Sequence, residues 1–435
     1  MTQMTQIPDV YESKDYRRSR NAYRLECTFE YFVQLLAGGA FLATLLSSIG
    51  MSDKTIGIVS SLVSFAFLFQ LFSIFVVQKI RNTKRFVVLF HSLGQIGFML
   101  VYLIPFMPFA AEFRQVLVVP CILIAYAGNY FVTSVLFKWG NSFVDPNKRA
   151  SYSAGQEMIS LALGVVISWT IGFMMDYFEA QNNLKGGFLF AAIAILIFSA
   201  SDFVMLLLIK NQVKEKAEKA DVAPMREVFK NTLGNKNFLS VVILTIIWNI
   251  ASYTTVGFLG TYNIKELAFS VGVVQVITTA GTAARFFVSK PFGRFSDKHS
   301  FAKGIELALL FATLAFLCVF CTTPSTRYLL IGYTVLHALC MAGLNSNMMN
   351  IVYSYVDERY FVQASAIKNC IGGLCGFAAS FAAGELLDYI QSNGNMIFGI
   401  HIYGQQVLAL ITTVLVVIAL LYTHFVIGKQ KVMKQ

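Results

Sequence analysis

The sequence predicts an all-α membrane protein of twelve transmembrane helices, built as two six-helix bundles that are related by a parallel repeat. Long apolar segments, an uneven distribution of Lys and Arg, and similarity between the two halves lead to this prediction. Of the 435 residues, 56% are hydrophobic and 13% are charged. Soluble domains are about 25% charged, and a soluble protein this apolar would expose large hydrophobic patches to water. The composition therefore predicts that lipid surrounds the chain.

The chain begins with a polar, basic tail over residues 1–24, which lacks the apolar core of a signal peptide. A bundle is expected over 25–209, a charged linker over 210–237, a second bundle over 238–427 and a tail over 428–435. Asp221 and Pro224 mark the start of a short amphipathic helix in the linker. A spanning helix needs about 20 mostly apolar residues, and the predicted spans are 26–49, 55–78, 86–107, 116–138, 152–175, 187–209, 238–261, 269–290, 303–322, 328–350, 364–387 and 404–427.

The distribution of Lys and Arg predicts that both termini are cytoplasmic. In that orientation 27 of the 34 Lys and Arg residues lie on the inner side and five lie in outer loops, while Arg285 and Lys368 lie inside helices. Loops rich in Lys and Arg remain on the cytoplasmic side. The net charge of +11 thus needs no nucleic acid as partner, because the basic residues alternate with spans and form no single patch. We expect a monomer in the cytoplasmic membrane, and the absence of N-x-[ST] sequons fits a bacterial chain.

An internal repeat relates the two halves. A shift of 212 residues places 142–177 on 354–389 without a gap, and 11 of the 36 positions are identical. The identical pairs include Asp145/Asp357, Gly164/Gly376, Ser168/Ser380, Gly172/Gly384 and Asp176/Asp388. The repeat makes predicted helices 5 and 11 equivalent, and since six helices separate them, both run in the same direction. These are parallel repeats.

The predicted loop 291–303, PFGRFSDKHSFAK, carries a short motif of Gly293, Asp297 and Lys298. Gly293 has no side chain, so a neighbouring helix can come close. Asp297 can accept hydrogen bonds from the free amides at a helix N-terminus. The alternative is a solvated tight turn. Together with a further base at Lys303, the motif resembles the cytoplasmic loop signature of the major facilitator superfamily.

The twelve helices, the parallel repeat and the basic linker extend this resemblance over nearly the whole chain. The resemblance implies a secondary transporter that works by alternating access, with its substrate midway between the halves. It also implies that Asp297 contacts helix 5 of the other half. The matching loop of the first half, 76–85, lacks both the Gly and the Asp, so the two halves are expected to be held unequally.

Predicted helices 5 and 11 carry small residues at every fourth position. The two stripes are Ser160, Gly164, Ser168, Gly172 and Gly372, Gly376, Ser380, Gly384. Such stripes allow helix backbones to approach closely in lipid, either as static packing or as a sliding surface between the halves. Helix 5 lacks the Gly-Pro pair of the family's antiporter signature, which disfavours drug–proton exchange.

Charged side chains within the spans are functional candidates because they are costly in a bilayer. Glu157 and Arg285 lie at similar depths near the cytoplasmic side, and the resemblance places their helices opposite each other. We expect them to pair when that side is closed; a permanent structural pair or a snorkelling Arg285 is the alternative. Lys368 is a second gate candidate or a contact for an anionic group. Glu30 can carry a coupling proton or cap a polar network near the inner surface.

The remaining polar residues within the spans form a neutral set that can hydrogen-bond and stack. They are Gln34, Asn129, Thr133, Trp248, Asn249, Tyr253, Gln275, Thr278, Thr282, His337 and Asn345. The resemblance places most of them on helices that line the cavity. Such a set suits a polyhydroxylated ligand better than a bulky cation, which would need carboxylates. Each of them alone is equally compatible with an interhelical hydrogen bond.

The leading hypothesis is therefore a secondary transporter of a small polar organic solute, such as a sugar or glycoside, coupled to a proton or another cation. An exporter of drugs or metabolites and a non-transporting membrane sensor are the alternatives. An enzyme is not expected, and neither is a cofactor or a metal site, because the sequence has no metal-ligand cluster, no G-x-S-x-G and no nucleotide-binding loop, and its His residues are scattered.

Overall fold

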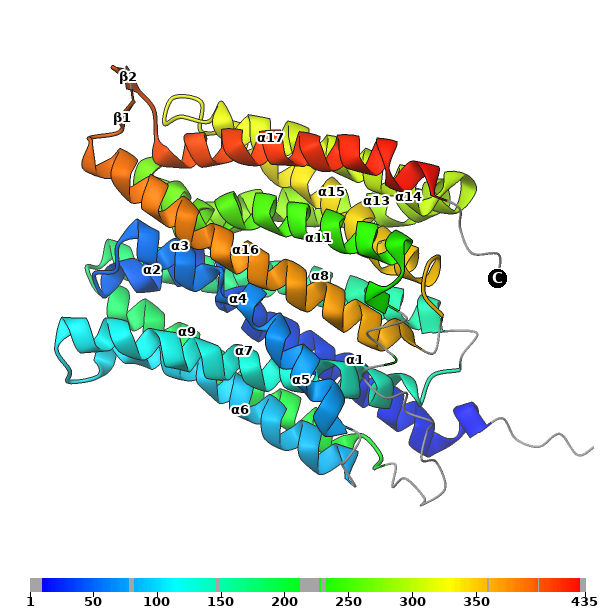
Figure 1. Ribbon diagram of the computed structural model, residues 1–435. Helices are drawn as coiled ribbons and strands as arrows, with labels where there is room; N and C mark the ends of the chain where they lie inside the picture. Colours follow the sequence, from blue (N-terminus) through cyan, green and yellow to red (C-terminus); the bar gives the residue numbers. More distant parts are fainter. Residues whose placement is uncertain are drawn as a thin grey trace, which may run out of the picture.

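The computed structural model describes residues 10–77, 82–145, 149–211, 227, 232–357, 360–397 and 399–430. Two helical bundles lie against each other along their length (Figure 1). The beginning of α1 and the end of α17 lie at one end of the molecule, and a small hairpin lies at the other. The end that holds α1's start is called the terminal end below, and the opposite end the hairpin end.

The N-terminal bundle contains nine helical segments. They are α1 (Lys14–Leu36), α2 (Gly39–Ser48), α3 (Asp53–Ser60), α4 (Leu62–Phe65), α5 (Phe67–Val77), α6 (Thr83–Leu103), α7 (Ala111–Asn141), α8 (Arg149–Ala180) and α9 (Leu184–Leu208). Short 3₁₀ turns, η1 (Val10–Glu12) and η2 (Ile104–Phe106), precede α1 and follow α6.

The C-terminal bundle has the corresponding elements. They are α11 (Lys236–Thr255), η4 (Val256–Phe258), α12 (Leu259–Thr261), the π turn η5 (Tyr262–Glu266), α13 (Val271–His299), α14 (Phe301–Phe320), α15 (Leu329–Tyr353), α16 (Phe361–Ser392), α17 (Gly404–Phe425) and η7 (Ile427–Lys429). Strands β1 (Met396–Ile397) and β2 (Ile400–His401) pair antiparallel between α16 and α17.

Within the described residues, eleven helices are long and apolar enough to cross a membrane, and α1 with α2 makes a twelfth span if the bent pair is counted as one. The two helices meet at 45°. The break follows from Gly38, whose backbone is extended, and Gly39, whose φ of +57° favours glycine. The fold class predicted from the sequence is therefore confirmed, with a first span that is broken rather than straight.

The repeat is visible in the helix boundaries. Helices α8 and α16 both have 32 residues, and a shift of 212 carries Arg149 onto Phe361 and Ala180 onto Ser392. Two glycine pairs of the repeat occupy equivalent environments. Gly164 packs against Tyr31 of α1, and Gly376 packs against Tyr253 of α11. These stripe positions serve packing within each half, whereas Gly172 and Gly384 face the other half.

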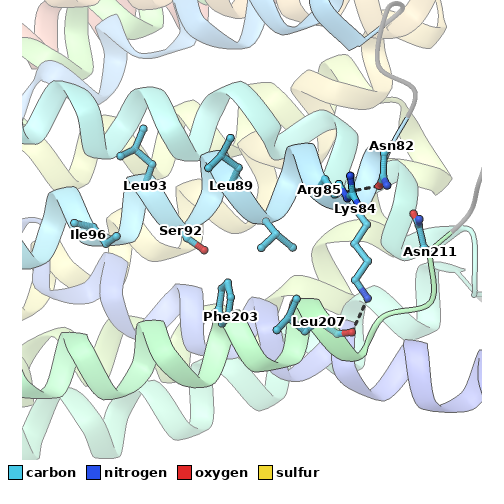
Figure 2. A pocket seen from close by; sticks show the side chains of 11 residues that line it. Asn82, Lys84, Arg85, Leu89, Ser92, Leu93, Ile96, Phe203, Leu207 and Asn211 are labelled. Carbon is cyan, nitrogen blue, oxygen red and sulfur yellow. Dashed lines mark hydrogen bonds between the residues drawn. The ribbon is translucent and has the colours of Figure 1, made fainter.

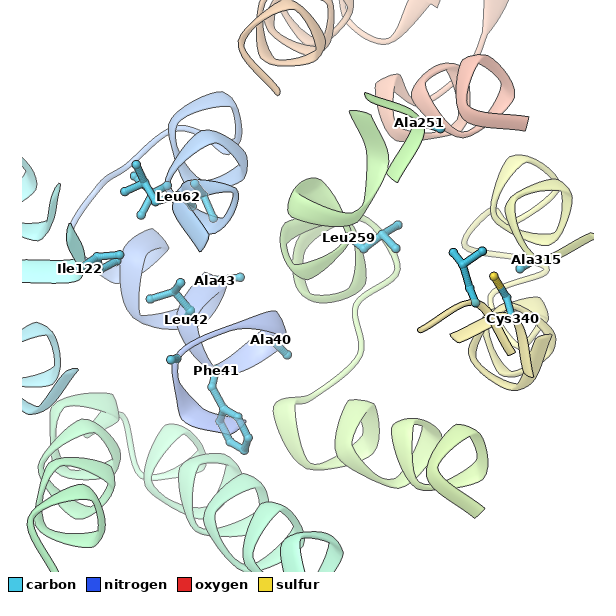
Figure 3. Close-up of a cluster of buried hydrophobic side chains, with 14 of the residues drawn as sticks. Ala40, Phe41, Leu42, Ala43, Leu62, Ile122, Ala251, Leu259, Ala315 and Cys340 are labelled. Atoms are coloured by element: carbon cyan, nitrogen blue, oxygen red, sulfur yellow. The ribbon is translucent and has the colours of Figure 1, made fainter. Parts of the chain in front are cut away.

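The largest core cluster runs through both bundles (Figure 3). It includes Phe41 of α2, Leu259 of α12 and Ala315 of α14, all buried. Many large apolar side chains instead lie on the outer surface, such as Leu89 and Val166. Since lipid is the surroundings of a membrane protein, these exposed side chains are the expected composition of its periphery.

Two predicted segments differ from the structure or fall outside it. The linker helix expected from Asp221 and Pro224 lies outside the described residues. The loop expected at 291–303 is wrong as a loop, because α13 continues through Pro291 to His299 and only Ser300 separates it from α14. Ser300 caps α14 by accepting a hydrogen bond from the Lys303 amide, so the two helices need no longer connection.

Candidate functional site

A cavity of about 350 Å³ lies between the two bundles. Residues from α1, α8, α12, η5, α13 and α15 line it, so both halves contribute. Its polar and aromatic lining consists of Tyr31, Asn263, Thr278, Thr282, Arg285, Tyr333, Thr334 and His337. Pockets for small ligands start at about 300 Å³, so the cavity has room for one small solute.

The free hydrogen-bonding groups in this cavity are few. Thr278 and Thr282 donate to carbonyl oxygens of their own helix, which leaves their oxygen lone pairs as acceptors. His337 stacks on Tyr333 with ring centroids 5.3 Å apart. Its Nε2 is buried and has no hydrogen-bond partner within the described residues. The hydroxyl groups of a ligand could form hydrogen bonds both with the threonine oxygens and with the imidazole nitrogen of His337.

An ion pair lies at the edge of this cavity. Arg285 of α13 donates to Glu157 Oε1 of α8 at 2.9 Å, and the two side chains are 33% and 52% exposed. The structure thus joins the two halves through the two charges that the sequence places at matching depth. Further towards the hairpin end, the Trp169 indole donates to Thr279 Oγ1 at 2.8 Å. The α8–α13 seam is therefore polar in its middle.

A second group of charged residues is buried inside the N-terminal bundle, between α1, α6 and α9. His91 Nε2 lies 3.0 Å from Asp202 Oδ2, 3.7 Å from Glu26 Oε1 and 3.2 Å from the Gln95 amide nitrogen. All four side chains are at most 1% exposed. Glu30 lies one turn along α1 and accepts a hydrogen bond of 2.7 Å from Gln34. We call these five acidic, imidazole and amide residues, Glu26, Glu30, His91, Gln95 and Asp202, the buried polar cluster.

The buried polar cluster has more acceptors than donors. One imidazole nitrogen carries at most one proton, yet oxygens of Glu26, Asp202 and Gln95 have no hydrogen-bond partner within the described residues. Three carboxylates with one imidazole also carry excess negative charge, which is costly away from water. Protons or a cation are needed to balance it. Ligand atoms of Glu26, Glu30 and His91 lie within 4.8 Å of one another, which is close enough for one ion.

Lys368 lies apart from both groups. It is 2% exposed, and its ammonium donates to the Met348 carbonyl of α15 at 3.0 Å. No acidic partner of Lys368 is found in the described part of the chain. Lys368 does not line the cavity between the halves, so the structure gives a direct substrate contact no support.

The hairpin end is closed by contacts between the halves. Asp176, at the end of α8, accepts hydrogen bonds from the Ser270 hydroxyl at 2.7 Å and the Gly272 amide at 3.0 Å. Asp53 at the start of α3 pairs with Lys265 at 2.5 Å and accepts from Gln391 at 3.0 Å. These contacts bind α13 and α16 to the first half.

The other predicted site residues do not line this cavity. Asn129 packs against Gly94 of α6, and Thr133 donates to the Asn129 carbonyl. Asn249 and Tyr253 pack against glycines of α16, and Asn249 also donates to the Thr245 carbonyl. Trp248 packs against the main core cluster, Gln275 contacts α8 at Gly172, and Asn345 is exposed on α15. Of the predicted polar set, only Thr278, Thr282 and His337 line the cavity.

The 293–298 motif does not form the predicted contact within the described residues. A methyl group added to Gly293 would meet no atom within 4 Å, so no helix approaches it closely. Asp297 and Lys298 are exposed in the last turns of α13. The residues just before α8, at 146–148, lie outside the described part. The close approach expected at Gly293 is therefore corrected for the described residues: the buried face of this part of α13 is that of Phe292 and Ser296, which pack against Gly343 and Gly304.

Sequence reasoning missed Glu26, His91 and Gln95 as functional candidates. Glu26 and Glu30 are four residues apart on one helix face, and so are His91 and Gln95. Both spacings can be seen in the sequence. The contact between α1 and α6 could not be predicted, because no local sequence pattern determines which face of α6 meets α1.

Comparison with known families decides the identity of this architecture. The profile of the Major Facilitator Superfamily matches residues 28–380 and 250–431. The chain belongs to the Major Facilitator Superfamily. It is thus a multi-pass membrane protein and a secondary transporter of a small molecule, not an enzyme, as the sequence predicts. No curated protein sequence matches the chain.

Solved transporter structures share the fold of this superfamily member at low sequence identity. The nucleoside transporter NupG is 12% identical, with a TM-score of 0.67, over 96% of this chain and 100% of that chain. A POT family transporter in complex with a thioalcohol-conjugated peptide is 16% identical, with a TM-score of 0.67, over 96% of each chain. A bacterial homologue of the human lysosomal transporter Spinster, inward-facing and unoccupied, is 15% identical, with a TM-score of 0.67, over 97% of this chain and 100% of that chain.

Proposed function

We propose that the protein is a cation-coupled importer of a small polar organic solute, such as a sugar or glycoside, in the cytoplasmic membrane of a bacterium. Both termini face the cytoplasm in this proposal. The observation that carries it is the lining of the cavity between the halves. None of the lining residues is acidic, and Arg285, the charged one, already pairs with Glu157.

The chemistry of the lining favours a neutral ligand over a bulky cation. A cationic drug would need a carboxylate to replace its hydration, and the cavity offers hydroxyl oxygens, an amide and the unpartnered His337 Nε2 instead. Tyr31 and Tyr333 add aromatic faces against which a sugar ring can pack. These groups support recognition of a polyhydroxylated solute.

Coupling is proposed to use a proton held by Glu30 in the buried polar cluster. Glu30 is the cluster residue that is only partly buried, and its partner Gln34 is exposed. A carboxyl that exchanges its proton only when the cavity opens to one side can link proton movement to solute movement. The low-identity fold relatives carry no argument about substrate, so the test must compare solute classes directly.

The test is uptake of labelled solutes into proteoliposomes, with and without a pH gradient. The panel contains sugars, glycosides, nucleosides and short peptides. We expect a sugar or glycoside to accumulate, up to about tenfold for an inward gradient of one pH unit, since one unit corresponds to a factor of ten. Uptake of no polyhydroxylated solute under any gradient contradicts the proposed substrate class.

The variant Glu30→Gln separates binding from coupling. It should abolish accumulation driven by the pH gradient while solute exchange across the membrane continues, because the cavity itself is unchanged. Glu112→Gln, at an exposed carboxyl in the first turn of α7, is the matched control and should accumulate solute like the unmodified protein. If Glu30→Gln still accumulates solute fully, the coupling ion binds elsewhere.

A further inference from the structure

We propose that the groove between α6 and α9 binds one anionic phospholipid from the leaflet at the terminal end. The groove has a volume of about 570 Å³ and lies on the outer surface of the N-terminal bundle (Figure 2). Eleven residues of α6, α9 and their flanking turns line it: Asn82, Lys84, Arg85, Val88, Leu89, Ser92, Leu93, Ile96, Phe203, Leu207 and Asn211. It is separate from the cavity between the halves and shares no residue with it.

The groove is polar at one end and apolar along the rest of its length. Lys84 and Arg85 lie at the polar end in Figure 2, beside Asn82 and Asn211. From there the apolar side chains continue along α6 to Ile96. Leu89 and Ile96 are 65% and 47% exposed. The polar end of the groove is complementary to the charged headgroup of a phospholipid, and its apolar part is complementary to a hydrocarbon chain.

The length of the groove matches one leaflet. Arg85 and Ile96 are eleven residues apart on one helix, which is about 16 Å at 1.5 Å per residue. The hydrocarbon core of a bilayer is about 30 Å thick, so one leaflet contributes about 15 Å. A chain whose headgroup lies at Arg85 would therefore end near Ile96.

The charges at the polar end select an anionic headgroup. Within the described residues the Arg85 guanidinium forms no hydrogen bond or ion pair; only its backbone amide bonds to Asn82. The Lys84 ammonium donates to the carbonyls of Leu207 and Ile209 at 2.5 and 2.8 Å, which leaves one of its three protons free. No lining residue is acidic. A phosphodiester accepts from both cations, whereas the ammonium of a zwitterionic lipid would be repelled by them.

The groove lies directly behind the buried polar cluster. Ser92 lines the groove while its neighbour His91 points into the cluster, and Phe203 lines it while Asp202 contacts His91 at 3.0 Å. A bound lipid would contact both α6 and α9. It would hold the two helices at the distance that the contact between His91 and Asp202 requires. Lys84 already links the two helices at the same end.

The test is fluorescence quenching by brominated lipids, measured on the full-length protein in mixed bilayers as the difference from the protein that carries only its three native tryptophans. Leu93→Trp places a reporter in the groove, and Leu196→Trp places one on the exposed face of α9 outside it. Brominated phosphatidylglycerol and brominated phosphatidylcholine are compared at equal fractions. We expect the Leu93→Trp reporter to favour phosphatidylglycerol by at least about fivefold, the contribution of one of the two cationic side chains near an anionic lipid. The Leu196→Trp reporter should show about equal quenching by both lipids.

Variants of Arg85 assign the preference to the headgroup site. In the Leu93→Trp background, Arg85→Gln should lower the preference, because only Lys84 then remains beside the headgroup, and Arg85→Lys should retain most of it. Arg17→Gln removes an exposed arginine of α1 that does not line the groove, and it should leave the preference unchanged. Equal quenching by both lipids at Leu93→Trp, or a preference that Arg85→Gln leaves unchanged, overturns the proposal.

Discussion

The two seams between the halves are related by the repeat but are held by different interactions. In the first seam α8 packs on α13, and in the second α16 packs on α3, α4 and α5. The first seam is polar along its length, from Asp176 at the hairpin end through Trp169 to the Glu157–Arg285 pair. In the second, Lys54 pairs with Glu385 at 2.7 Å at the hairpin end.

The inner part of the second seam depends on close backbone packing. Phe65 of α4 and Phe377 of α16 have ring centroids 5.3 Å apart, and Gly373 faces the Ser64 carbonyl directly. The repeat places Asn369 where the first seam has Glu157, so the charge that pairs with Arg285 has no counterpart. Opening of the terminal end therefore breaks an ion pair in the first seam, whereas separating the second seam breaks the Phe65–Phe377 contact. The two seams are expected to respond to different changes.

We expect the largest loss of transport when a methyl group is added in the second seam. In Gly373→Ala the new Cβ would lie 2.3 Å from the Ser64 carbonyl oxygen, a backbone atom that cannot rotate away. Overpacking of this kind costs about 1–3 kcal/mol, so we expect transport to fall by about tenfold or more and thermal stability to fall with it. Transport assays and melting curves on the purified protein measure both.

Two other glycine substitutions serve as comparisons for Gly373→Ala. Gly172→Ala in the first seam meets Gly272 Cα at 3.0 Å, a contact that a small helix shift relieves, so its loss should be several times smaller. Gly293→Ala adds a methyl group in open space and should have no effect. Equal losses at Gly373 and Gly172 would mean that the seams are packed alike.

A smaller effect is expected from the ion pair of the first seam. Each single reversal, Glu157→Arg or Arg285→Glu, places two like charges at a distance of about one hydrogen bond. Because both side chains are partly exposed, we expect about a tenfold loss of transport rather than the loss typical of a fully buried pair. The double reversal restores opposite charges and should recover most of the rate. A double reversal no better than either single change removes the pair from the gating mechanism.

The fold was largely predictable because the length of the apolar segments and the similarity between the two halves can both be read along the sequence. The spans, the two bundles and the equivalence of α8 and α16 all follow from them. The bend between α1 and α2 was not predicted, since two adjacent glycines are also compatible with a straight helix. The continuation of α13 through Pro291 was not predicted because proline usually ends a helix.

The candidate site was only partly predictable because cavity lining depends on helix rotation. Glu157 and Arg285 form an ion pair, as their similar depths in the membrane predict. Asn129 and Asn249, on helices that the resemblance assigns to the cavity, instead pack against glycines of neighbouring helices. A polar residue facing a neighbouring helix and one facing the cavity have the same sequence signature. His91 becomes a candidate only once α6 is seen to face α1 and α9.

The smallest expected difference compares two aspartates that the repeat makes equivalent. Asp176 accepts two hydrogen bonds at the N-terminus of α13, and its loss in Asp176→Asn should lower the free energy of unfolding by about 1 kcal/mol. Asp388 lies 4.0 Å from Lys54, which keeps its closer partner Glu385, so Asp388→Asn should be silent. Chemical denaturation of the two variants in the same micelles measures the difference. Equal losses would make the hairpin ends of the seams equivalent and would confine their asymmetry to the Glu157–Arg285 pair and the Gly373 contact.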